Sequence, residues 1–149
     1  MNLHWHRRDL RLDDNRGLAA AAEGEAIGLF VFDPTVLDHA APPRLSFMLD
    51  ALDSLQAEYE DRGTDLLVAH GNPVELVPAI ADESDVSTVT WCADYSGLAR
   101  ERDAAVRRAL DDEGIERRAV HDAVHQKPGS ITTNSGDPYK VFTYFSKKW

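Results

Sequence analysis

Charged side chains stand directly after several apolar stretches of the sequence, where they could organise ligand chemistry. The stretch HWHRRDLRLDDN, residues 4–15, places Arg7, Arg8 and Arg11 within five positions of a chain that is otherwise acidic. Guanidinium groups make charge-assisted, often paired hydrogen bonds to carboxylates and phosphates. Together with the charged residues that follow other apolar stretches, this pattern favours a site for a polar ligand, anionic or hydrogen-bonding. Those further residues are Asp33, Arg44, Asp94, Arg100 and Arg102.

Each of these residues also has a purely structural interpretation. The arginines can pair with Asp9, Asp13 and Asp14 and so hold their own loop, because local ion pairs are common on protein surfaces. Asp33 can cap a turn that begins at Pro34. The stretch RERD, residues 100–103, can be an ordinary solvated helix face. The charges by themselves therefore indicate a ligand without naming one.

Several kinds of catalytic or cofactor site lack their sequence signatures. No G-x-G-x-x-G pattern follows the first apolar stretch and no G-x-x-x-x-G-K-[ST] occurs, which argues against dinucleotide and nucleoside triphosphate sites. His4 and His6 alternate along one stretch, but the sequence offers no obvious third metal ligand. The single cysteine, Cys92, ends an apolar run and is expected to be a small buried side chain. We therefore predict no catalytic residue and no metal site.

The charged residues must be positioned by the apolar stretches that precede them. Five stretches have the length and composition of strands: residues 2–6, 26–33, 65–70, 87–93 and 115–121. Stretches with helical spacing or helix signals lie between them, at about residues 16–23, 43–62, 74–83 and 98–113. This alternation predicts an α/β fold, a Rossmann-like five-stranded parallel sheet with helices on both faces. The last strand is more polar than the others and is expected at an edge.

A parallel sheet of this kind would bring the charged residues together. Ligands of open parallel sheets bind beyond the carboxyl ends of the strands, near the point where the strand order switches. Asp33 ends one predicted strand, and Arg8 and Asp94 come shortly after two others. The topology therefore predicts that they share one rim of the sheet.

The overall composition is that of a folded, acidic protein. The chain has 149 residues, of which 43% are hydrophobic, and this suggests one domain with an ordinary core. Its formal net charge of -10 argues against a broad nucleic-acid-binding surface on these residues. Many Asp, few Lys and abundant Ala are typical of proteins from salt-loving organisms. Because no signal pattern or membrane-length apolar run occurs, we expect a soluble cytoplasmic protein.

The composition changes after residue 122. Residues 1–122 contain all the predicted strands and are interpreted as one α/β domain. Residues 123–149 are rich in Gly, Pro, Ser and Thr and then in aromatic and basic side chains, as in an extended segment that leaves a domain. We therefore interpret residues 123–149 as the start of an interdomain linker.

Several motifs resemble the DNA photolyase and cryptochrome family, in collinear order over nearly the whole chain. They are WHRRDLRLDDNRGLAAA (residues 5–21), FDP (32–34), PPRLSFMLDAL (42–52), GNPVELVP (71–78), RERDAAV (100–106) and GDPYKVFTYF (136–145). The likeness is greatest to microbial photolyases that repair cyclobutane pyrimidine dimers, of haloarchaeal type.

The resemblance implies the N-terminal domain of a deoxyribodipyrimidine photo-lyase, a light-dependent DNA repair enzyme. In that family an α/β domain carries a light-harvesting antenna, and a helical C-terminal domain binds FAD and acts on a flipped-out pyrimidine dimer. The helical domain is absent from these residues, so the segment alone is expected to bind no FAD and to be inactive. The expected partners are the antenna molecule, the chain's own helical domain and, through the full-length protein, damaged DNA, with no membrane involved.

The resemblance also implies a choice of antenna. Family members use a chromophore of the 8-hydroxy-5-deazaflavin type, a reduced folate or a flavin. Folate-binding relatives carry an Asn-Glu pair where this chain has Leu98 and Ala99, which disfavours folate. Matching to deazaflavin-binding relatives implies the binding residues Arg8, Phe30, Asp33, Arg44, Asp94, Arg100 and Arg102. The chain departs from the family at residues 96–98, SGL where such relatives often have EPY, and at Ser146, where the family usually has Trp.

Two other functions share much of this pattern. A cryptochrome-like blue-light photoreceptor would have the same N-terminal domain without the repair activity. A stand-alone nucleotide-binding module would have the same alternating architecture, but it would need a Gly-rich phosphate loop that this sequence lacks.

Overall fold

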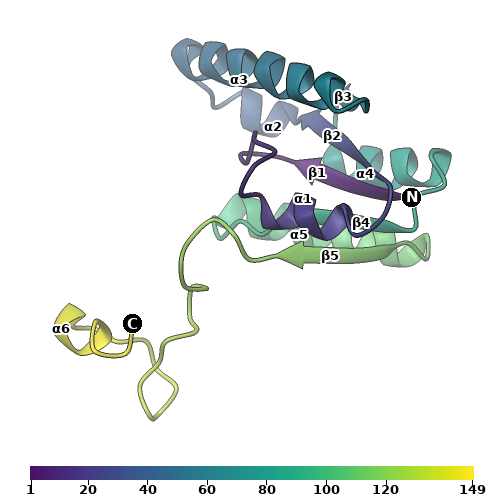
Figure 1. Ribbon diagram of the computed structural model, residues 1–149. Helices are drawn as coiled ribbons and strands as arrows, with labels where there is room; N and C mark the ends of the chain where they lie inside the picture. Colours follow the sequence, from purple (N-terminus) through teal and green to yellow (C-terminus); the bar gives the residue numbers. More distant parts are fainter.

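The computed structural model describes residues 1–149 as an α/β domain followed by an extended tail (Figure 1). Five parallel strands form one sheet in the order β3-β2-β1-β4-β5, which confirms the sheet predicted from the sequence. The strands are β1 (Asn2–His6), β2 (Ala26–Phe32), β3 (Leu66–His70), β4 (Thr88–Cys92) and β5 (Glu116–Val120).

Strand β1 lies at the centre of the sheet between β2 and β4. Trp5 is in register with Leu29 of β2, and Leu3 is in register with Val89 of β4. The chain proceeds from β1 towards one edge and then returns to the other side of β1, so the switch in strand order lies between β1 and β4. A crevice beyond the carboxyl ends is expected at this point. Strand β5 lies at an edge with mostly exposed residues, as predicted.

Helices cover both faces of the sheet. They are α1 (Arg16–Ala21), α2 (Pro34–Leu37), α3 (Pro42–Asp61), α4 (Pro73–Glu83), α5 (Gly97–Asp112) and, in the tail, α6 (Phe142–Phe145). The sequence predicted α1, α3, α4 and α5 to within a few residues. It did not predict α2 or α6, because one turn of helix is too short to show apolar spacing. None of the helices combines the length and the apolarity needed to cross a membrane.

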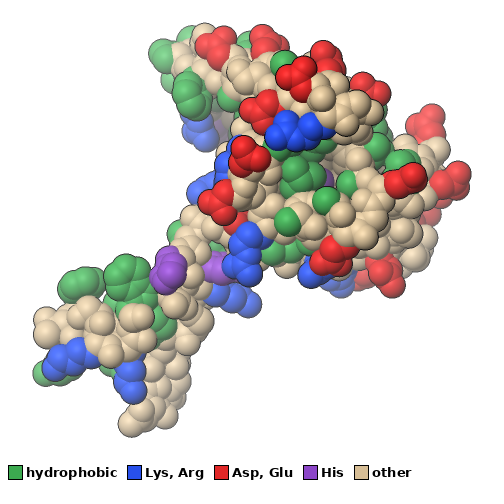
Figure 2. Space-filling model, viewed as in Figure 1, with side chains coloured by type: hydrophobic (Ala, Val, Ile, Leu, Met, Phe, Trp, Pro, Cys, Tyr) green, Lys and Arg blue, Asp and Glu red, His purple; other side chains and the backbone are tan.

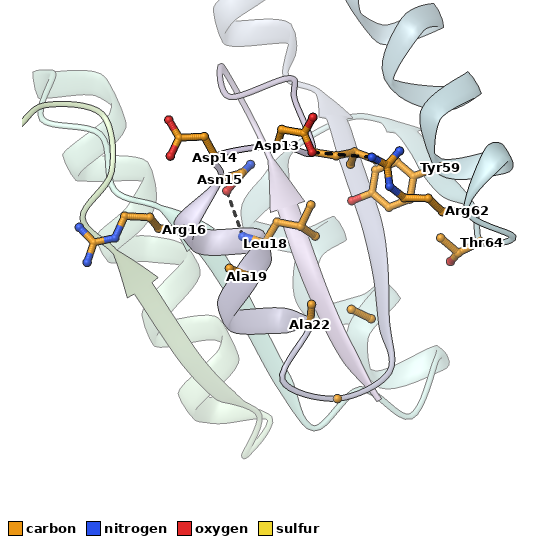
Figure 3. A pocket seen from close by; sticks show the side chains of 13 residues that line it. Asp13, Asp14, Asn15, Arg16, Leu18, Ala19, Ala22, Tyr59, Arg62 and Thr64 are labelled. Carbon is orange, nitrogen blue, oxygen red and sulfur yellow. Dashed lines mark hydrogen bonds and ion pairs between the residues drawn. The ribbon is translucent and has the colours of Figure 1, made fainter.

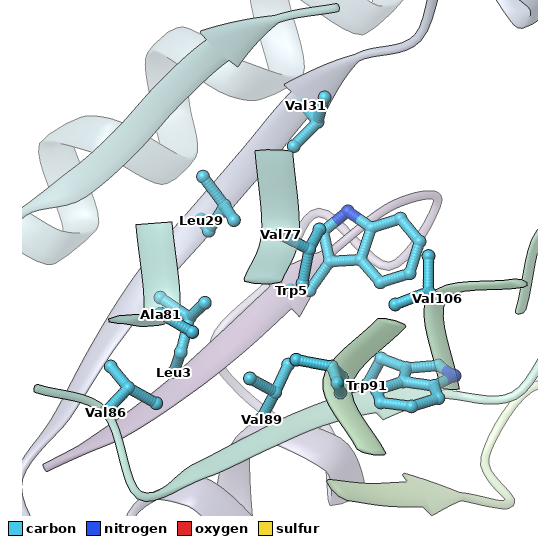
Figure 4. Close-up of a cluster of buried hydrophobic side chains, with 11 residues drawn as sticks. Leu3, Trp5, Leu29, Val31, Val77, Ala81, Val86, Val89, Trp91 and Val106 are labelled. Carbon is cyan, nitrogen blue, oxygen red and sulfur yellow. The ribbon is translucent and has the colours of Figure 1, made fainter. Parts of the chain in front are cut away.

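The alternation of side chains along the strands separates two apolar clusters. Leu3 and Trp5 of β1 belong to the cluster beneath α4 and α5 (Figure 4), with Leu29, Val31, Val77, Ala81, Val86, Val89, Trp91, Val106 and Leu110. On the other face, Phe30 packs with three residues of α3 and one of β3, namely Leu52, Leu55, Tyr59 and Leu66. Full burial of a large side chain in these clusters, such as Leu29 or Phe30, contributes about 1.5–3 kcal/mol to the free energy of folding.

Side chains that precede the helices define where the helices begin. Asn15 Oδ1 accepts a hydrogen bond from the backbone N–H of Leu18 at 3.0 Å and so caps α1. Asp33 Oδ1 accepts from the N–H of Thr35 at 3.0 Å and caps α2, as its structural interpretation anticipated. Caps of this kind are worth about 1 kcal/mol each.

The N-terminal half of α3 extends beyond the carboxyl edge of the sheet (Figure 1). The buried residues of α3 are Leu52, Leu55 and Tyr59, all in its C-terminal half. In the other half, Phe47 is 76% exposed and Leu49 is 48% exposed. Apolar spacing continues along the whole helix, but only the second half covers the sheet. The first half overhangs the rim where the charged residues gather.

Residues 123–149 lead away from the sheet after β5 (Figure 1). The view in Figure 2 shows acidic side chains spread over the α/β domain, whereas the visible face of the tail carries lysines and hydrophobic side chains. Phe142, Tyr144 and Trp149 are all more than half exposed, and Lys147 Nζ lies 5.8 Å from the centre of the Tyr144 ring. The tail therefore presents aromatic surface that the α/β domain does not cover.

Candidate ligand pocket at the carboxyl edge of the sheet

A cavity of about 640 Å³ opens at the carboxyl edge of the sheet. Its volume lies in the range of small-molecule sites. Residues that follow β1 and β4 line it, together with the end of β2 and residues of α2, α3 and α5. Six of the seven residues predicted to bind a ligand line this cavity: Arg8, Phe30, Asp33, Arg44, Asp94 and Arg102. The seventh, Arg100, lies on the exposed surface of α5 outside the lining.

One side of the cavity is apolar. Val36 of α2 and two residues of the overhanging half of α3, Leu45 and Met48, line it beside Phe32 at the end of β2. The rings of Phe30 and Phe32 meet edge to face, with their centroids 5.0 Å apart. Such a wall suits a flat aromatic ring or an alkyl group. Sequence reasoning missed Val36 because α2 carries no periodic signal.

The other side of the cavity carries arginines that are already paired with carboxylates. Arg8 Nη1 lies 3.5 Å from Asp94 Oδ2, and Arg102 Nη1 lies 3.5 Å from Asp33 Oδ2. Arg44 also lines the cavity, and no carboxylate lies within ion-pair distance of it. The pairing leaves this side much less positive than the sequence suggested. It therefore favours a ligand with hydrogen-bonding groups, with one unpaired guanidinium available for an anionic group.

Arg7 lines the cavity as well, although the sequence placed it in the loop without assigning it to the site. Its side chain is only 7% exposed, and Nη1 lies 2.5 Å from Asp103 Oδ1. Nη2 donates to the carbonyl oxygen of Cys92. Burial lowers the pKa of the Arg7 guanidinium, and the carboxylate of Asp103 opposes that shift. The only sequence signal for a role of Arg7 in the site is its position beside Arg8, and this does not show which of the two side chains points inward.

Asp94 lies two residues beyond the end of β4 and is held in its ionised form. Its Oδ1 accepts a hydrogen bond from the backbone N–H of Ser96 at 3.0 Å. Partial burial raises the pKa of Asp94, but the Ser96 hydrogen bond and the charge of Arg8 together outweigh it, so the pKa is lowered. Asp94 therefore offers a ligand acceptor oxygens at neutral pH.

The loop that carries the arginines rests on a buried polar network. Asp9 Oδ2 lies 3.4 Å from Nε2 of His4 and accepts from Nδ2 of Asn15 at 3.0 Å. His6 Nδ1 lies 3.1 Å from the carbonyl oxygen of Asp9, and His6 Nε2 lies 2.8 Å from the hydroxyl of Tyr59. The network joins β1, α1 and α3 beneath the loop. It gives both histidines of HWH a structural role.

The arginines of this loop do not pair with the carboxylates of the same loop, contrary to the structural interpretation of the sequence. Arg7 and Arg8 pair with Asp103 and Asp94, and Arg11 Nη2 lies 2.7 Å from Asp122 Oδ2. The physical reason is that Asp9 is turned inward by its hydrogen bonds. The other two acids offer the loop's arginines no side-chain contact, since Asp13 Oδ1 lies 3.7 Å from Arg62 of α3 and Asp14 contributes only its carbonyl oxygen, to Arg11.

Side chains of types that bind metals meet beneath the loop. One donor atom each of His4, Asp9 and Cys92 lies within 4.8 Å of the others, a set that could not be seen in the sequence because Cys92 is on β4. The amide of Asn15 lies among them, with Oδ1 3.2 Å from Cys92 Sγ and Nδ2 3.0 Å from Asp9 Oδ2. Burial raises the pKa of the Cys92 thiol to about 12. These groups therefore act as a hydrogen-bonded framework, and Cys92 is buried as predicted.

A second cavity, of about 610 Å³, lies between α1 and α3 on the opposite side of the loop (Figure 3). Leu18 and Ala22 of α1 and Tyr59 of α3 form part of its wall. Arg62 spans one end and reaches Asp13 at 3.7 Å. None of the seven residues predicted to bind a ligand lines this cavity.

Comparison with known proteins gives the pocket a family context. A sequence model of the DNA photolyase family matches residues 2–149. The deoxyribodipyrimidine photo-lyase of Halobacterium salinarum is 54% identical over 100% of this chain, and that of a Synechococcus strain is 41% identical over 99%. The chain spans about a third of the length of these relatives, 33% and 31% respectively.

Solved structures share the fold. A class III photolyase of Agrobacterium tumefaciens superposes with a TM-score of 0.84 at 28% identity, over 95% of this chain and 30% of that one. A photolyase of the archaeon Sulfolobus tokodaii, whose structure has two FAD molecules, superposes with a TM-score of 0.83 at 28% identity, over 98% of this chain and 33% of that one. By its sequence and its fold alike, the chain belongs to the DNA photolyase family.

Proposed function

We propose that this chain is the N-terminal part of a deoxyribodipyrimidine photo-lyase and that it holds a light-harvesting antenna chromophore in the pocket at the carboxyl edge of the sheet. The observation that carries the proposal is the division of the pocket into an apolar wall and a polar edge. A flat chromophore with a hydrogen-bonding rim requires both. The family of the chain supports the same function.

An 8-hydroxy-5-deazaflavin type chromophore is the antenna that the pocket favours. Val36, Leu45 and Phe32 would contact its ring system, and Asp94 and Arg44 would hydrogen-bond to its polar groups. A flavin is the alternative. The structure of the Sulfolobus relative contains two FAD molecules and is described as implying a novel light-harvesting cofactor, which favours a flavin antenna. Reduced folate is the least favoured of the three, because Leu98 and Ala99 replace the pair that holds the pterin in folate-binding relatives.

The residues of the pocket need only hold and orient the chromophore. When bound, the chromophore absorbs light and passes the excitation energy on without making or breaking bonds. The apolar wall excludes water from its ring, and the paired arginines fix the polar edge in one arrangement. No general acid or nucleophile is required at this site, so the protein's contribution is rigidity and orientation.

The remaining parts of the activity belong to a longer protein. The relatives are about three times as long as this chain, and we infer that residues 123–149 lead from the α/β domain, residues 1–122, towards a helical domain. That helical domain would bind FAD and the damaged DNA, so these 149 residues alone would not repair DNA. The exposed aromatic side chains of the tail, Phe142 and Tyr144 among them, suit contact with another domain. The acidic composition suits a salt-rich cytoplasm.

A cryptochrome-like photoreceptor is the second candidate. A protein named cryptochrome DASH, from Natronomonas pharaonis, is 35% identical over 97% of this chain. The α/β domain is common to both kinds of protein, so the helical domain distinguishes them. Membership of the family leaves a stand-alone nucleotide-binding module without support.

Titration with candidate chromophores tests the proposal. The purified chain is titrated with 8-hydroxy-5-deazariboflavin, riboflavin and 5,10-methenyltetrahydrofolate, and binding is followed by the fluorescence anisotropy and absorption spectrum of each probe. We expect saturable binding that is tightest for the deazaflavin. Arg62→Ala, in the second cavity, is the control and should leave the affinity unchanged. If none of the three probes binds, the proposal is wrong. The proposal that the chain is part of a longer photo-lyase is tested by reading the coding sequence downstream of Trp149 for a helical flavin domain.

A further inference from the structure

Asp103 of α5 lies behind the pocket and contacts two of the arginines that line it. We propose that Asp103 is a positioning residue for the ligand, because it fixes the guanidinium groups of Arg7 and Arg102 and, through them, the polar edge of the pocket. This inference rests on the proposed chromophore site. Asp103 does not line the cavity, and the sequence analysis did not assign it to the binding residues.

The carboxylate of Asp103 is surrounded by nitrogen donors from three parts of the fold. Oδ1 lies 2.5 Å from Nη1 of Arg7 and 3.8 Å from Nε of Arg102, and Oδ2 accepts from Nε1 of Trp91 at 3.2 Å. Asp103 is only 2% exposed. A carboxylate buried to this degree is stable only with such partners. Asp103 therefore ties the loop after β1, strand β4 and helix α5 together at the rim.

Both guanidinium groups lie against the same aromatic ring. The guanidinium carbons of Arg7 and Arg102 are 5.0 Å and 5.2 Å from the centre of the Trp5 ring, and all three residues line the cavity. The Nε atoms of both arginines are buried and have no hydrogen-bond partner. The orientation of each guanidinium therefore depends on its Nη contacts and on the carboxylate of Asp103.

The negative charge of Asp103 is what allows two cations to share this site. Like charges beside one ring repel each other, and a carboxylate placed between them offsets the repulsion. Arg102 is held from its other side by Asp33, at 3.5 Å, whereas Arg7 has no second carboxylate within ion-pair distance. Loss of the Asp103 charge would leave Arg7 as a buried cation without a counter-ion and would release Arg102 towards Asp33. Both shifts would change the polar edge that a ligand meets.

The substitution Asp103→Asn tests the inference because it keeps the shape of the side chain and removes its charge. The full chain is titrated with 8-hydroxy-5-deazariboflavin, and the induced circular dichroism of the bound chromophore reports its orientation. We expect roughly tenfold weaker binding, the usual scale for loss of a charge-assisted contact, and an altered induced signal. Asp111→Asn is the matched control, since Asp111 is an ion-paired carboxylate on the exposed side of the same helix. It should leave both readouts unchanged.

A second measurement separates this inference from the proposed function. The side-chain 15N resonances of Arg7 and Arg102 report restricted rotation of their guanidinium groups in the free protein, without any chromophore. We expect restricted rotation in the unsubstituted chain and in Asp111→Asn. In Asp103→Asn we expect faster rotation of the Arg7 guanidinium, which loses its one carboxylate, and a smaller change for Arg102, which keeps Asp33. If no probe binds the unsubstituted chain, the proposed function fails while this measurement still tests the role of Asp103. Unchanged guanidinium rotation, or unchanged affinity together with an unchanged induced signal, would overturn the inference.

Asp103→Glu covers the case in which Asp103→Asn does not fold. The longer side chain keeps the charge but displaces it by one methylene group, so the fold keeps its counter-ion while the two guanidiniums move. We expect a folded protein with a changed induced signal and weaker binding. Trp91→Phe removes the indole donor and leaves both arginine contacts in place, so its affinity should stay that of the unsubstituted chain. Loss of affinity in Trp91→Phe as large as in Asp103→Glu would assign the effect to packing and overturn the inference.

Discussion

Arg102 Nη1 of α5 lies 3.5 Å from Asp33 Oδ2, just after β2, so helix α5 and the end of β2 are joined at the pocket, although β2 and β4 lie on opposite sides of β1. Both side chains are largely shielded from solvent, with exposed fractions of 15% and 10%. Asp33 also caps α2 through its other oxygen. One carboxylate therefore sets both the position of α2, which contributes Val36 to the apolar wall, and the position of an arginine on the polar edge.

Asp33→Asn separates these two roles of Asp33. Asparagine caps a helix about as well as aspartate, so the unfolding midpoint should change by no more than about 2 °C. The charge that holds Arg102 is lost, so affinity for the chromophore should fall. Parallel thermal unfolding and chromophore titration measure both effects. Affinity equal to that of the unsubstituted chain would remove Asp33 from the site.

Arg8→Ala should weaken chromophore binding without unfolding the domain. The Arg8 side chain is 64% exposed, and exposed ion pairs such as Arg8–Asp94 contribute at most about 1 kcal/mol to stability. Loss of Arg8 leaves the ionised Asp94 at the pocket without its cation. Chromophore affinity measured beside the unfolding midpoint checks this expectation. A large fall in the midpoint would show that Arg8 holds the fold instead of the ligand.

The buried network beneath the loop should make the fold sensitive to mild acid. Burial and the neighbouring His4 lower the pKa of His6 to about 4, against about 6.5 in an unfolded chain. The folded state disfavours protonation of His6, so neutral His6 contributes to the free energy of unfolding. That contribution is complete above about pH 6.5 and is lost as the pH falls towards 4. The loss amounts to about 3 kcal/mol. Urea unfolding midpoints measured from pH 8 to pH 4 should show it.

Protonation of Asp9 should cause a second loss of stability at lower pH. Its burial alone would raise the pKa, but the hydrogen bond and charge of His4 outweigh burial, so the pKa of Asp9 is lowered. Its contribution is therefore present above about pH 4 and is lost below that value. His6→Phe is the control for the pair: it should flatten the slope between pH 6.5 and pH 4 and leave the loss at lower pH. An unchanged slope would exclude His6 as its source.

Gly17→Ala should destabilise the domain although alanine favours helices. A Cβ at Gly17 would lie 2.7 Å from Cε1 of His4 and 2.8 Å from Sγ of Cys92, so α1 would have to move away from β1 and β4. We expect a loss of about 1–3 kcal/mol in the free energy of unfolding. Gly97→Ala, at the start of α5 with no atom within 4 Å of the new Cβ, is the control and should be neutral or stabilising by up to about 1 kcal/mol. Equal effects of the two substitutions would contradict the close approach of α1.

Cys92 should be unreactive in the folded protein. Its thiol is buried, and burial raises its pKa to about 12, so almost no thiolate is present at pH 8. A disulfide reagent such as Ellman's should label it slowly in buffer and rapidly in concentrated urea. Labelling at equal rates in the two conditions would show that β4 opens to solvent.

Much of the fold follows from local patterns in the sequence. Apolar runs of strand length alternate with helical spacing, and the handedness of parallel crossovers then leaves few arrangements for the sheet. The polar composition of β5 marks it as an edge, and the predicted start of the first helix agrees with α1, which Asn15 caps. The rim position of Arg8, Asp33 and Asp94 follows in the same way, since each lies within two residues of the end of a strand.

The tertiary structure decided which charges meet. Arg7 and Asp103 are 96 residues apart, and their contact exists because β1 and β4 are neighbours and Arg7, not Arg8, turns inward. The sequence shows which residues are charged. Which of them pair depends on their distances and rotamers, and these are determined by the packing of the structure. The same holds for the meeting of His4 with Cys92 and for the overhang of α3. Local periodicity predicts elements, whereas ion pairs and pocket walls depend on how distant elements pack.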